Sequence, residues 1–174
     1  MARFADADKG GFFSTSDDHE ALVARRKDLE DAPIPSGGSA AAFGLLRLAA
    51  LTGEAAYEDH AVSHLRLLHE IAPRHPGAFG HFLQAMDFHL GPTREVALVG
   101  APDGVAALAG VVRSAFRPHL VLAGGPGDAE GSAVPLMEGR TPVEGRAAAY
   151  VCERFACQRP VTGGDELQAL LEAG

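Results

Sequence analysis

Tryptophan is absent from the 174-residue chain, and aromatic residues make up only 6% of it. Flat side chains on which nucleic-acid bases or sugar rings could stack are therefore scarce. The chain has 15 Lys and Arg against 23 Asp and Glu, a formal net charge of −8, and it has no long basic run. This balance is opposite to the one that binding to phosphate backbones requires, so we expect no nucleic-acid partner.

Long apolar runs and clusters of cysteine are missing as well. No apolar stretch reaches the roughly 18 residues of a membrane-spanning helix, because Arg47 or glycines interrupt the longest ones. The first residues, MARFADADKGG, lack the apolar centre of a signal peptide. Two cysteines are too few for a disulfide scaffold. We therefore expect a cytoplasmic protein that does not enter a membrane.

The composition that remains is typical of a globular protein, with 47% hydrophobic and 22% charged residues. The length suits one domain or two small ones. The residue pattern predicts an α+β fold in three parts. We expect a β-hairpin or loop segment over residues 1–35, helical hairpins over residues 36–91, and a small α/β subdomain over residues 92–174.

The first two parts differ in their periodicity. Residues 10–15 (GGFFST) predict a turn that enters a short strand, and residues 22–25 a returning strand. Residues 40–51 are apolar apart from Arg47, which predicts a helix buried on all sides with Ser36 or Ser39 as its cap. Apolar residues at helical spacing predict further helices, over residues 54–72 and 76–90.

The last part alternates strands and helices. Residues 94–100 and 119–123 read as strands that flank a helix over residues 103–116, which is the pattern of a right-handed βαβ unit. Residues 146–152 predict a third strand and residues 165–173 a closing helix. The glycine-rich loops of this part lack the spacing of nucleotide-binding motifs, so ordinary tight turns are favoured and no cofactor is expected.

Acidic and histidine side chains provide the first candidates for chemistry. Asp28, Glu30 and Asp31 cluster in one segment, where paired carboxylates could act on a glycoside or could simply be solvated. His60 and His64 lie four residues apart on a predicted helix, but no third ligand is evident, so an exposed pair is favoured and no metal is expected.

Asp87 falls close to the apolar stripe of the helix predicted over residues 76–90. A buried carboxylate there would need a hydrogen-bonding partner, which favours a structural role over catalysis.

The two cysteines, Cys152 and Cys157, are separated by four residues and do not form a CxxC motif. A turn could bring their Cα atoms within the roughly 7 Å that a disulfide requires. Two buried free thiols are the favoured alternative in a reducing cytoplasm.

Several sequence blocks occur in one order along the chain: GGFFST at 10–15, Arg25 with Lys27, Asp31 and PSGGS at 35–39, LLRL at 45–48 with LTG at 51–53 and Tyr57, Asp87-Phe88 with Gly91-Pro92 and REV at 94–96, and AYVC at 149–152 with FACQ at 155–158 and PVT at 160–162. With these blocks, the sequence from about Phe4 to Leu171 resembles the C-terminal end of the YyaL-type thioredoxin-domain proteins, the bacterial relatives of spermatogenesis-associated protein.

The resemblance implies an N-terminal thioredoxin-like domain joined to an (α/α)6 toroid like that of six-hairpin glycosidases and N-acylglucosamine 2-epimerases. It implies carbohydrate-related or redox chemistry, with a sugar-like small molecule as a partner. The residues that match, together with Asp28 from the acidic cluster, give candidate catalytic residues Lys27, Asp28 and Asp31, candidate substrate-binding residues Arg25, Ser36, Ser39 and Asp87, and candidate redox residues Cys152 and Cys157.

The chain departs from the family where Gly38 stands in place of a usual Asn, and where Glu30 and Ala32 replace a usual Tyr and Gly. It also carries only part of such a toroid, so the apolar helix over residues 40–51 should expose a surface that another chain covers. We expect a homo-oligomer, or docking on a separately encoded N-terminal portion. The alternative function is a non-catalytic assembly or binding module that oligomerises through this helix.

Overall fold

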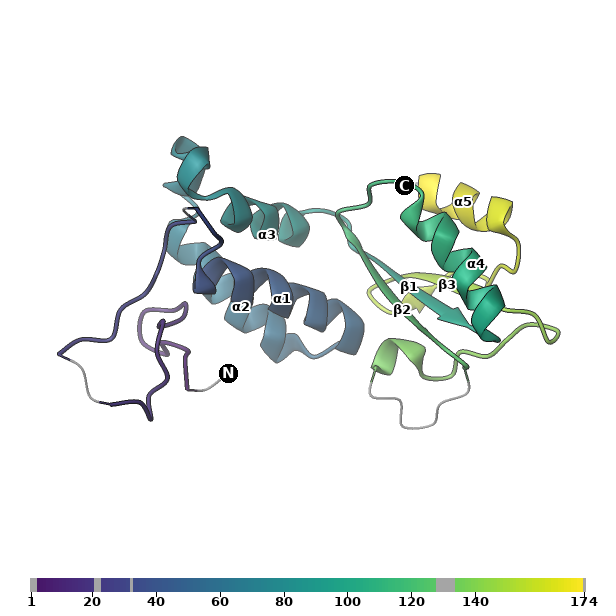
Figure 1. Cartoon of the computed structure of the whole chain (residues 1–174), viewed down its shortest axis with the longest axis horizontal. Helices are drawn as coiled ribbons and strands as arrows, with labels where there is room; N and C mark the ends of the chain where they lie inside the picture. The colour runs from purple at the N-terminus through teal and green to yellow at the C-terminus, as the bar shows by residue number, and fades with distance from the viewer. Residues whose placement is uncertain (1–2, 21–22, 32, 128–133, 174) are drawn as a thin grey trace. The chain divides into compact units, whose positions relative to one another are not determined.

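A computed structural model describes residues 3–20, 23–31, 33–127 and 134–173 of the chain. Within these residues, five α-helices and a four-stranded mixed sheet make the fold α+β, as predicted (Figure 1). The chain divides into two compact units. The first unit comprises residues 1–49 and 54–91, and the second comprises residues 50–53 and 92–174.

The first unit is built from three α-helices. Their bounds are α1 Gly37–Thr52, α2 Ala55–Leu68 and α3 Gly80–Leu90, with short 3-10 turns η1 Ala72–Arg74 and η2 Pro76–Ala78 between α2 and α3. Both turns have a proline in their first positions, which interrupts α-helical hydrogen bonding. The helices predicted over residues 54–72 and 76–90 are therefore each shorter than expected.

Helix α1 is buried on one side only. Leu45 and Leu46 are 4% exposed, whereas Leu48 is 42% exposed, and Ala40 and Gly44 are exposed as well. The prediction that this helix is surrounded on all sides is wrong for the chain as described.

The segment before α1 packs by irregular contacts. In place of the two predicted strands, residues 3–20 and 23–31 hold an isolated bridge between Ala5 and Phe12. Residues 21–22 lie outside the described residues. Gly10 and Gly11 both have a positive φ, 78° and 73°, and this turn brings the Gly11 N–H to the hydroxyl of Ser63 on α2 at 3.2 Å. The segment is thus held by α2 as well as by its own backbone.

The second unit contains the predicted βαβ arrangement. Its elements are β1 Arg94–Val99, α4 Pro102–Arg113, β2 Leu120–Gly125, η3 Pro135–Met137, β3 Ala148–Glu153, β4 Ala156–Cys157 and α5 Gly164–Glu172. The strand order is β2-β1-β3-β4. Strands β1 and β2 are parallel, and β3 runs antiparallel to both β1 and β4. The two-residue strand β4 was not predicted.

The sheet separates two hydrophobic clusters. Helices α4 and α5 cover one face (Figure 1), where Leu108 and Leu167 pack on Val96 and Val151. The second cluster lies on the other face and contains Ala97, Val99, Ala148 and Cys152 from the strands with Leu136 and Met137 from η3. Because side chains alternate along a strand, Glu95 lies on the same face as Ala97, Val99 and Cys152.

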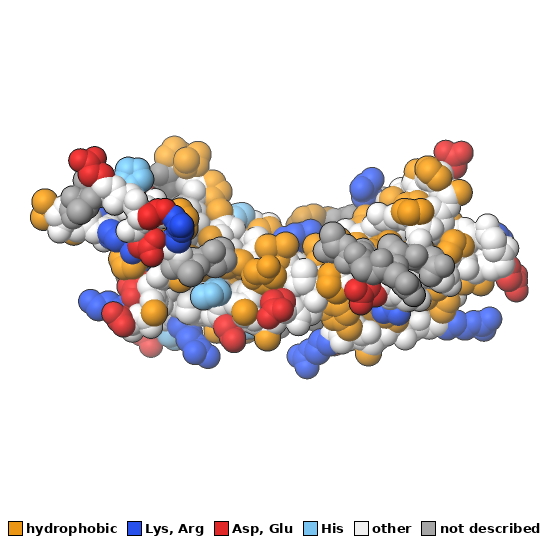
Figure 2. Space-filling view, turned by 90° about the horizontal axis from the view of Figure 1, so that it is seen from below, with side chains coloured by type: hydrophobic (Ala, Val, Ile, Leu, Met, Phe, Trp, Pro, Cys, Tyr) orange, Lys and Arg blue, Asp and Glu red, His pale blue; other side chains and the backbone are white. Residues whose placement is uncertain are grey.

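The surface is mixed in character. On the face seen in Figure 2, hydrophobic side chains reach the surface between charged ones. In the part of the chain that the structure describes, no helix is long and apolar enough to cross a membrane.

Candidate functional site

Asp31 links the beginnings of two helices in the first unit. One carboxylate oxygen accepts a hydrogen bond from the N–H of Ser36, just before α1, at 2.8 Å. The other accepts one from the N–H of Phe82, in the first turn of α3, also at 2.8 Å. Partial burial alone would raise the pKa of Asp31, but these N–H groups outweigh it and hold the pKa below its usual value. Asp31 is therefore an ionised acceptor that caps helix ends.

Ser36 and Ser39 form the buried cap of α1. The Ser36 hydroxyl accepts a hydrogen bond from the N–H of Ser39 at 3.1 Å and donates one to the Ser39 hydroxyl at 2.9 Å. Ser36 is 5% exposed and Ser39 is fully buried. The predicted cap at Ser36 is confirmed, and both hydroxyls face the interior of the unit.

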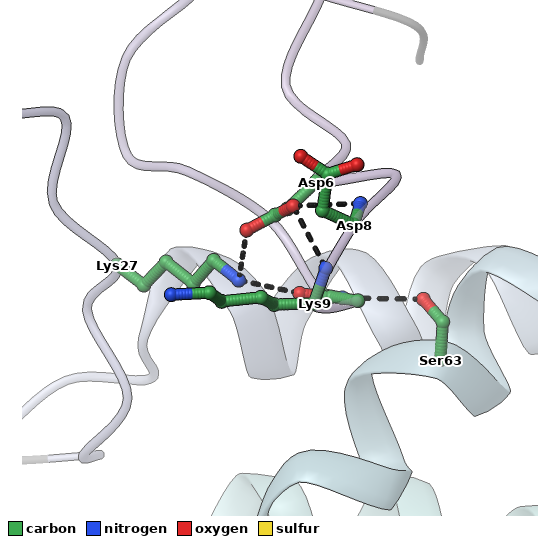
Figure 3. A network of polar contacts seen from close by, with 7 residues as sticks. Asp6, Asp8, Lys9, Lys27 and Ser63 are labelled. Carbon is green, nitrogen blue, oxygen red and sulfur yellow. Dashed lines mark hydrogen bonds and ion pairs between the residues drawn. The ribbon is translucent and has the colours of Figure 1, made fainter.

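Lys27 lies in a network of polar contacts with the first loop of the chain (Figure 3). Its ammonium group is 2.8 Å from the carboxylate of Asp6 and donates a hydrogen bond to the carbonyl of Gly10 at 2.5 Å. Asp6 also accepts hydrogen bonds from the N–H groups of Asp8 and Lys9. The hydrogen bond from Lys27 is the main reason that the pKa of Asp6 falls to about 2. Lys27 thus holds the loop over residues 6–10 against its own segment of the chain.

The other candidates of the first unit make different polar contacts, although Arg25 and Lys27 both lie over the ring of Phe13. Arg25 donates hydrogen bonds to the carbonyls of Arg3 and Thr15, and its guanidinium lies 4.1 Å from the ring centre of Phe13. Asp28 is exposed. Asp87 is exposed as well, so the expectation that it is buried beside the apolar stripe of its helix is wrong.

His64 on α2 is buried, so the prediction that it forms an exposed pair with His60 is wrong. It is fully buried, and neither ring nitrogen has a hydrogen-bonding partner among the described residues. Its ring centre lies 5.7 Å from that of Phe12 and 5.9 Å from that of Phe82. Burial, and then the charge of Lys27, lower the pKa of His64 to about 4 against a smaller opposing effect of Asp31. The imidazole is therefore neutral near pH 7.

Cys152 and Cys157 are joined in a disulfide, so the favoured alternative of two free thiols is not what the structure contains. They lie directly opposite each other on β3 and β4. The two residues of the connecting turn, Arg154 and Phe155, both have a positive φ, 49° and 64°, as the tightest hairpin turns require. Cys152 is 2% exposed, and Cys157 is half-buried.

Arg140 lies against the more accessible sulfur. Its Nη2 atom donates a hydrogen bond to Sγ of Cys157 at 2.8 Å, and its guanidinium lies 5.3 Å from the ring centre of Tyr150. The Tyr150 hydroxyl in turn donates to the carbonyl of Thr141 at 2.8 Å. A guanidinium at hydrogen-bond distance favours a thiolate over a thiol. The arrangement therefore suits Cys157 as the sulfur that leaves or attacks as an anion.

Glu95 is the buried carboxyl group of this site. It is 4% exposed and lies directly opposite Cys152 in the β1–β3 register. Its Oε2 atom accepts a hydrogen bond from the N–H of Phe155 at 2.7 Å. Burial raises the pKa of Glu95, hydrogen bonds from the N–H groups of Phe155 and Arg154 counteract this in part, and the charge of Glu153 adds to the increase. A carboxyl group of this kind can both hold and accept a proton.

Neither Glu95 nor Arg140 was named from the sequence. Glu95 carried a signal, because it is the one acid of a strand that is apolar from Val96 to Val99, and such an acid is buried if both faces of the sheet are covered. Arg140 carried no such signal, since it lies in a loop 17 residues before Cys157.

A groove of about 790 Å³ runs along the opposite face of the sheet, between α4 and β2. Val105, Ala109 and Leu122 contribute to its apolar lining, with Arg113 and Arg117 as charged members. Its lining residues include no acid and no nucleophile. The reactive side chains described above, Cys152, Cys157 and Glu95, are not among them. In the described part of the chain, no group of three or more His, Cys, Asp or Glu side chains is placed to hold a metal ion.

Comparison with known proteins shows homology to spermatogenesis-associated protein 20, as the resemblance predicted. The chain is 32% identical to the Rattus norvegicus protein over 174 residues, 33% identical to the Homo sapiens protein over 175 residues, and 31% identical to the Mus musculus protein over 174 residues. Each alignment covers 97% of this chain and 22% of the relative. The chain thus spans about a fifth of the length of the curated relatives it matches. No family model and no solved structure matches the chain.

Proposed function

We propose that the chain forms part of a YyaL-type thioredoxin-domain protein and that its second unit performs thiol–disulfide exchange with a dithiol. The observation that carries the proposal is the Cys152–Cys157 disulfide with Arg140 at hydrogen-bond distance from Cys157. Homology to spermatogenesis-associated protein 20 supports the relationship. In this proposal, a thioredoxin-like domain elsewhere in the longer protein supplies the dithiol, and the three helices of the first unit belong to an (α/α)6 toroid.

The position of the disulfide favours a redox role over a purely structural one. It closes a loop with a sequence separation of only five residues, inside a hairpin that backbone pairing already holds. Chain entropy then predicts a stabilisation of about 2 kcal/mol, at the lower end of the usual range. In a reducing cytoplasm, where we place the protein, disulfides are usually transient and catalytic.

Reduction of the pair proceeds in two balanced steps. A thiolate of the partner dithiol attacks Sγ of Cys157, the Cys152–Cys157 bond breaks, and Cys152 takes the electron pair and a proton. The second partner thiol, as a thiolate, then attacks the sulfur of its own chain in the mixed disulfide, and Cys157 leaves as a thiolate beside Arg140. The partner dithiol is oxidised to a disulfide, and the pair is reduced to two cysteines.

The carbohydrate part of the family resemblance finds less support. In the first unit, Asp31, Ser36 and Ser39 cap helices, and Lys27 holds a loop in place. These contacts explain the residues without a sugar. Sugar binding by these residues, together with Arg25, stays a prediction.

The proposal is tested by equilibrating the chain with glutathione buffers of graded potential and counting free thiols. We expect reversible formation of two thiols at a potential above about −300 mV, the range in which disulfides exchange with cellular thiols. The variant Cys152→Ser should trap a mixed disulfide at Cys157, and the matched variant Cys157→Ser should trap far less because Cys152 is buried. A disulfide that resists every glutathione ratio, or thiols that never pair, would contradict the proposal.

A second candidate function is assembly through α1. The observation that favours it is the exposed side of this helix, where Leu48 is 42% exposed. In this proposal that side contacts a second copy of the chain or the remainder of the longer protein.

A further inference from the structure

A buried carboxyl group faces the less accessible cysteine of the pair. We propose that Glu95 accepts the proton of the Cys152 thiol when the disulfide re-forms, and returns it when the disulfide is reduced. This inference rests on the proposed thiol–disulfide function, and it assigns Glu95 as a further catalytic residue of that site.

The geometry of the sheet places the two groups together. Glu95 on β1 and Cys152 on β3 are paired directly across an antiparallel ladder. Paired residues project from the same face, with Cβ atoms about 4.5–5.5 Å apart. Cys152 belongs to the cluster on this face together with Ala97, which is two residues after Glu95 on the same strand. On the β2 side of Glu95, the paired residue is the apolar Val121.

Burial makes a protein group necessary for this proton. Cys152 is 2% exposed and Glu95 is 4% exposed, so bulk water has little access to either. A thiol must lose its proton before its sulfur can attack. Glu95 is the carboxyl group that lies across from it, and a carboxylate is an effective proton acceptor when its acidity approaches the operating pH.

Among the described residues, no charged side chain forms an ion pair with the Glu95 carboxylate, which accepts hydrogen bonds from the backbone N–H groups of Phe155 and Arg154. Arg94 directs its guanidinium to the carbonyls of Leu170 and Leu171 on α5, at 3.2 and 2.6 Å. Arg140 donates a hydrogen bond to Sγ of Cys157. His119 flanks β2, where its carbonyl accepts the N–H of Arg94.

The remaining charged neighbours are on β3 and its turn. Glu153 raises the pKa of Glu95 by charge repulsion, and Arg154 acts on it through its backbone N–H. The main cause of the raised pKa is burial, which brings Glu95 closer to neutral pH than an exposed glutamate.

In the mixed disulfide, Cys157 is bonded to a partner sulfur and Cys152 is a thiol. The Cys152 proton moves to a Glu95 carboxylate oxygen while the sulfur electron pair forms the bond to Sγ of Cys157. The bond between Cys157 and the partner sulfur breaks, and its electron pair leaves on the partner thiolate. The two cysteines are thereby oxidised, and the partner disulfide that began the exchange is reduced.

The test uses the whole chain, reduced and then mixed with oxidised glutathione in a quenched-flow instrument between pH 5 and 9. Two rates are followed by mass spectrometry after acid quenching, the formation of the mixed disulfide at Cys157 and its resolution by Cys152. Glu95→Gln should slow resolution by about 10-fold or more at pH 6–7, with the difference narrowing towards pH 9, where hydroxide competes as the base. Formation of the mixed disulfide should be unchanged.

Glu166→Gln is the matched control, because it removes an exposed carboxylate on α5, which covers the opposite face of the sheet, and it should give the pH profile of the unaltered chain. If the unaltered chain resolves the mixed disulfide and Glu95→Gln follows the same profile, the role of Glu95 is wrong and the proposed function stands. If the unaltered chain forms no mixed disulfide at all, the proposed function itself is wrong.

A measurement on the unaltered chain keeps the inference testable where Glu95→Gln fails to fold. Carboxyl carbon NMR of 13C-labelled glutamate follows the titration of Glu95 in the disulfide and dithiol forms. Coupling between the two groups requires the titration midpoint to differ between the two forms. An identical midpoint would overturn the inference.

Discussion

Single side chains determine how the first unit responds to acid, and Asp31 is the clearest case. Its two carboxylate oxygens satisfy N–H groups at the beginnings of α1 and α3, which have no partners within the helices. Hydrogen bonds to a charged acceptor contribute about 1.5–3 kcal/mol each. One residue thus joins three segments of the unit.

Asp31→Asn keeps one oxygen acceptor and should lower the free energy of unfolding by about 2 kcal/mol. Because the folded pKa of Asp31 is lowered, its contribution is present above the unfolded value near pH 4 and is lost as pH falls through the folded value. Denaturant unfolding at several pH values measures both effects. Asp28→Asn, at an exposed neighbouring carboxylate, should change stability by less than about 0.5 kcal/mol; equal effects of the two variants would contradict the capping role.

His64 should act in a higher pH range. Its pKa is about 4 in the folded unit, against about 6.5 unfolded. The stability is complete above pH 6.5 and should fall by up to about 3 kcal/mol as the pH drops from 6.5 to 4, because only the unfolded chain takes up the proton readily. His64→Leu should remove this slope in denaturant unfolding while His60→Leu retains it. A slope that survives in His64→Leu would show that another group is responsible.

At the scale of elements, the hairpin β3–β4 depends on a turn that its residues do not favour. Arg154 and Phe155 occupy left-handed backbone positions, at φ 49° and 64°, which side chains other than Asn, Asp and Gly rarely adopt. Phe155 compensates by packing against the hydrophobic cluster that contains Cys152 and by donating its N–H to Glu95. Arg154 is exposed.

Arg154→Asn should therefore stabilise the second unit by up to about 1 kcal/mol, since Asn accepts the left-handed conformation more easily. The gain should be largest in the reduced protein, where the hairpin is not cross-linked. Urea unfolding with and without reductant measures it. Gln158→Asn, at an exposed position just after β4, is the control and should bring no gain; a loss of stability in Arg154→Asn would contradict the turn assignment.

The same elements show what the sequence could and could not predict. Strands β1 and β2 and helix α4 were predicted because they are apolar runs of the expected lengths. The helix was predicted over residues 103–116, but α4 ends at Arg113 and Phe116 is 89% exposed. Strand β4 escaped prediction, since two residues carry no periodicity and the strand exists only through its register with β3.

The candidate site, too, could be predicted only in part from the sequence. Cys152 and Cys157 were found from residue type alone. Their pairing depends on the turn between them, and the location of Glu95 depends on the β1–β3 register, neither of which is encoded locally. The two strands of the first segment were predicted wrongly because the contacts that hold Gly10 and Gly11 include a side chain of α2, more than 50 residues away.

At the scale of the whole molecule, the exposed side of α1 yields a prediction about association. A leucine that is 42% exposed on an otherwise small-residue face suits contact with another chain. If that side mediates assembly, Leu48→Glu should reduce the light-scattering mass of a concentrated sample towards 18.1 kDa, the mass of one chain.

The control is Leu90→Glu, at a leucine that is 73% exposed at the end of α3, which should leave the mass unchanged. Circular dichroism should show both variants folded, because neither leucine is buried. A mass of one chain at every concentration before any substitution would contradict self-association through α1.

The close approach of Gly38 to the His64 ring has a consequence for how related sequences vary. Any side chain at position 38 would overlap the imidazole, which is itself enclosed by Phe12 and Phe82. Exchange at either position alone is therefore disfavoured, and the two should be inherited as a matched pair. In homologues that carry the family's usual Asn in place of Gly38, we expect a smaller residue than histidine at the position of His64, so that an alignment of many homologues would show the two columns changing together.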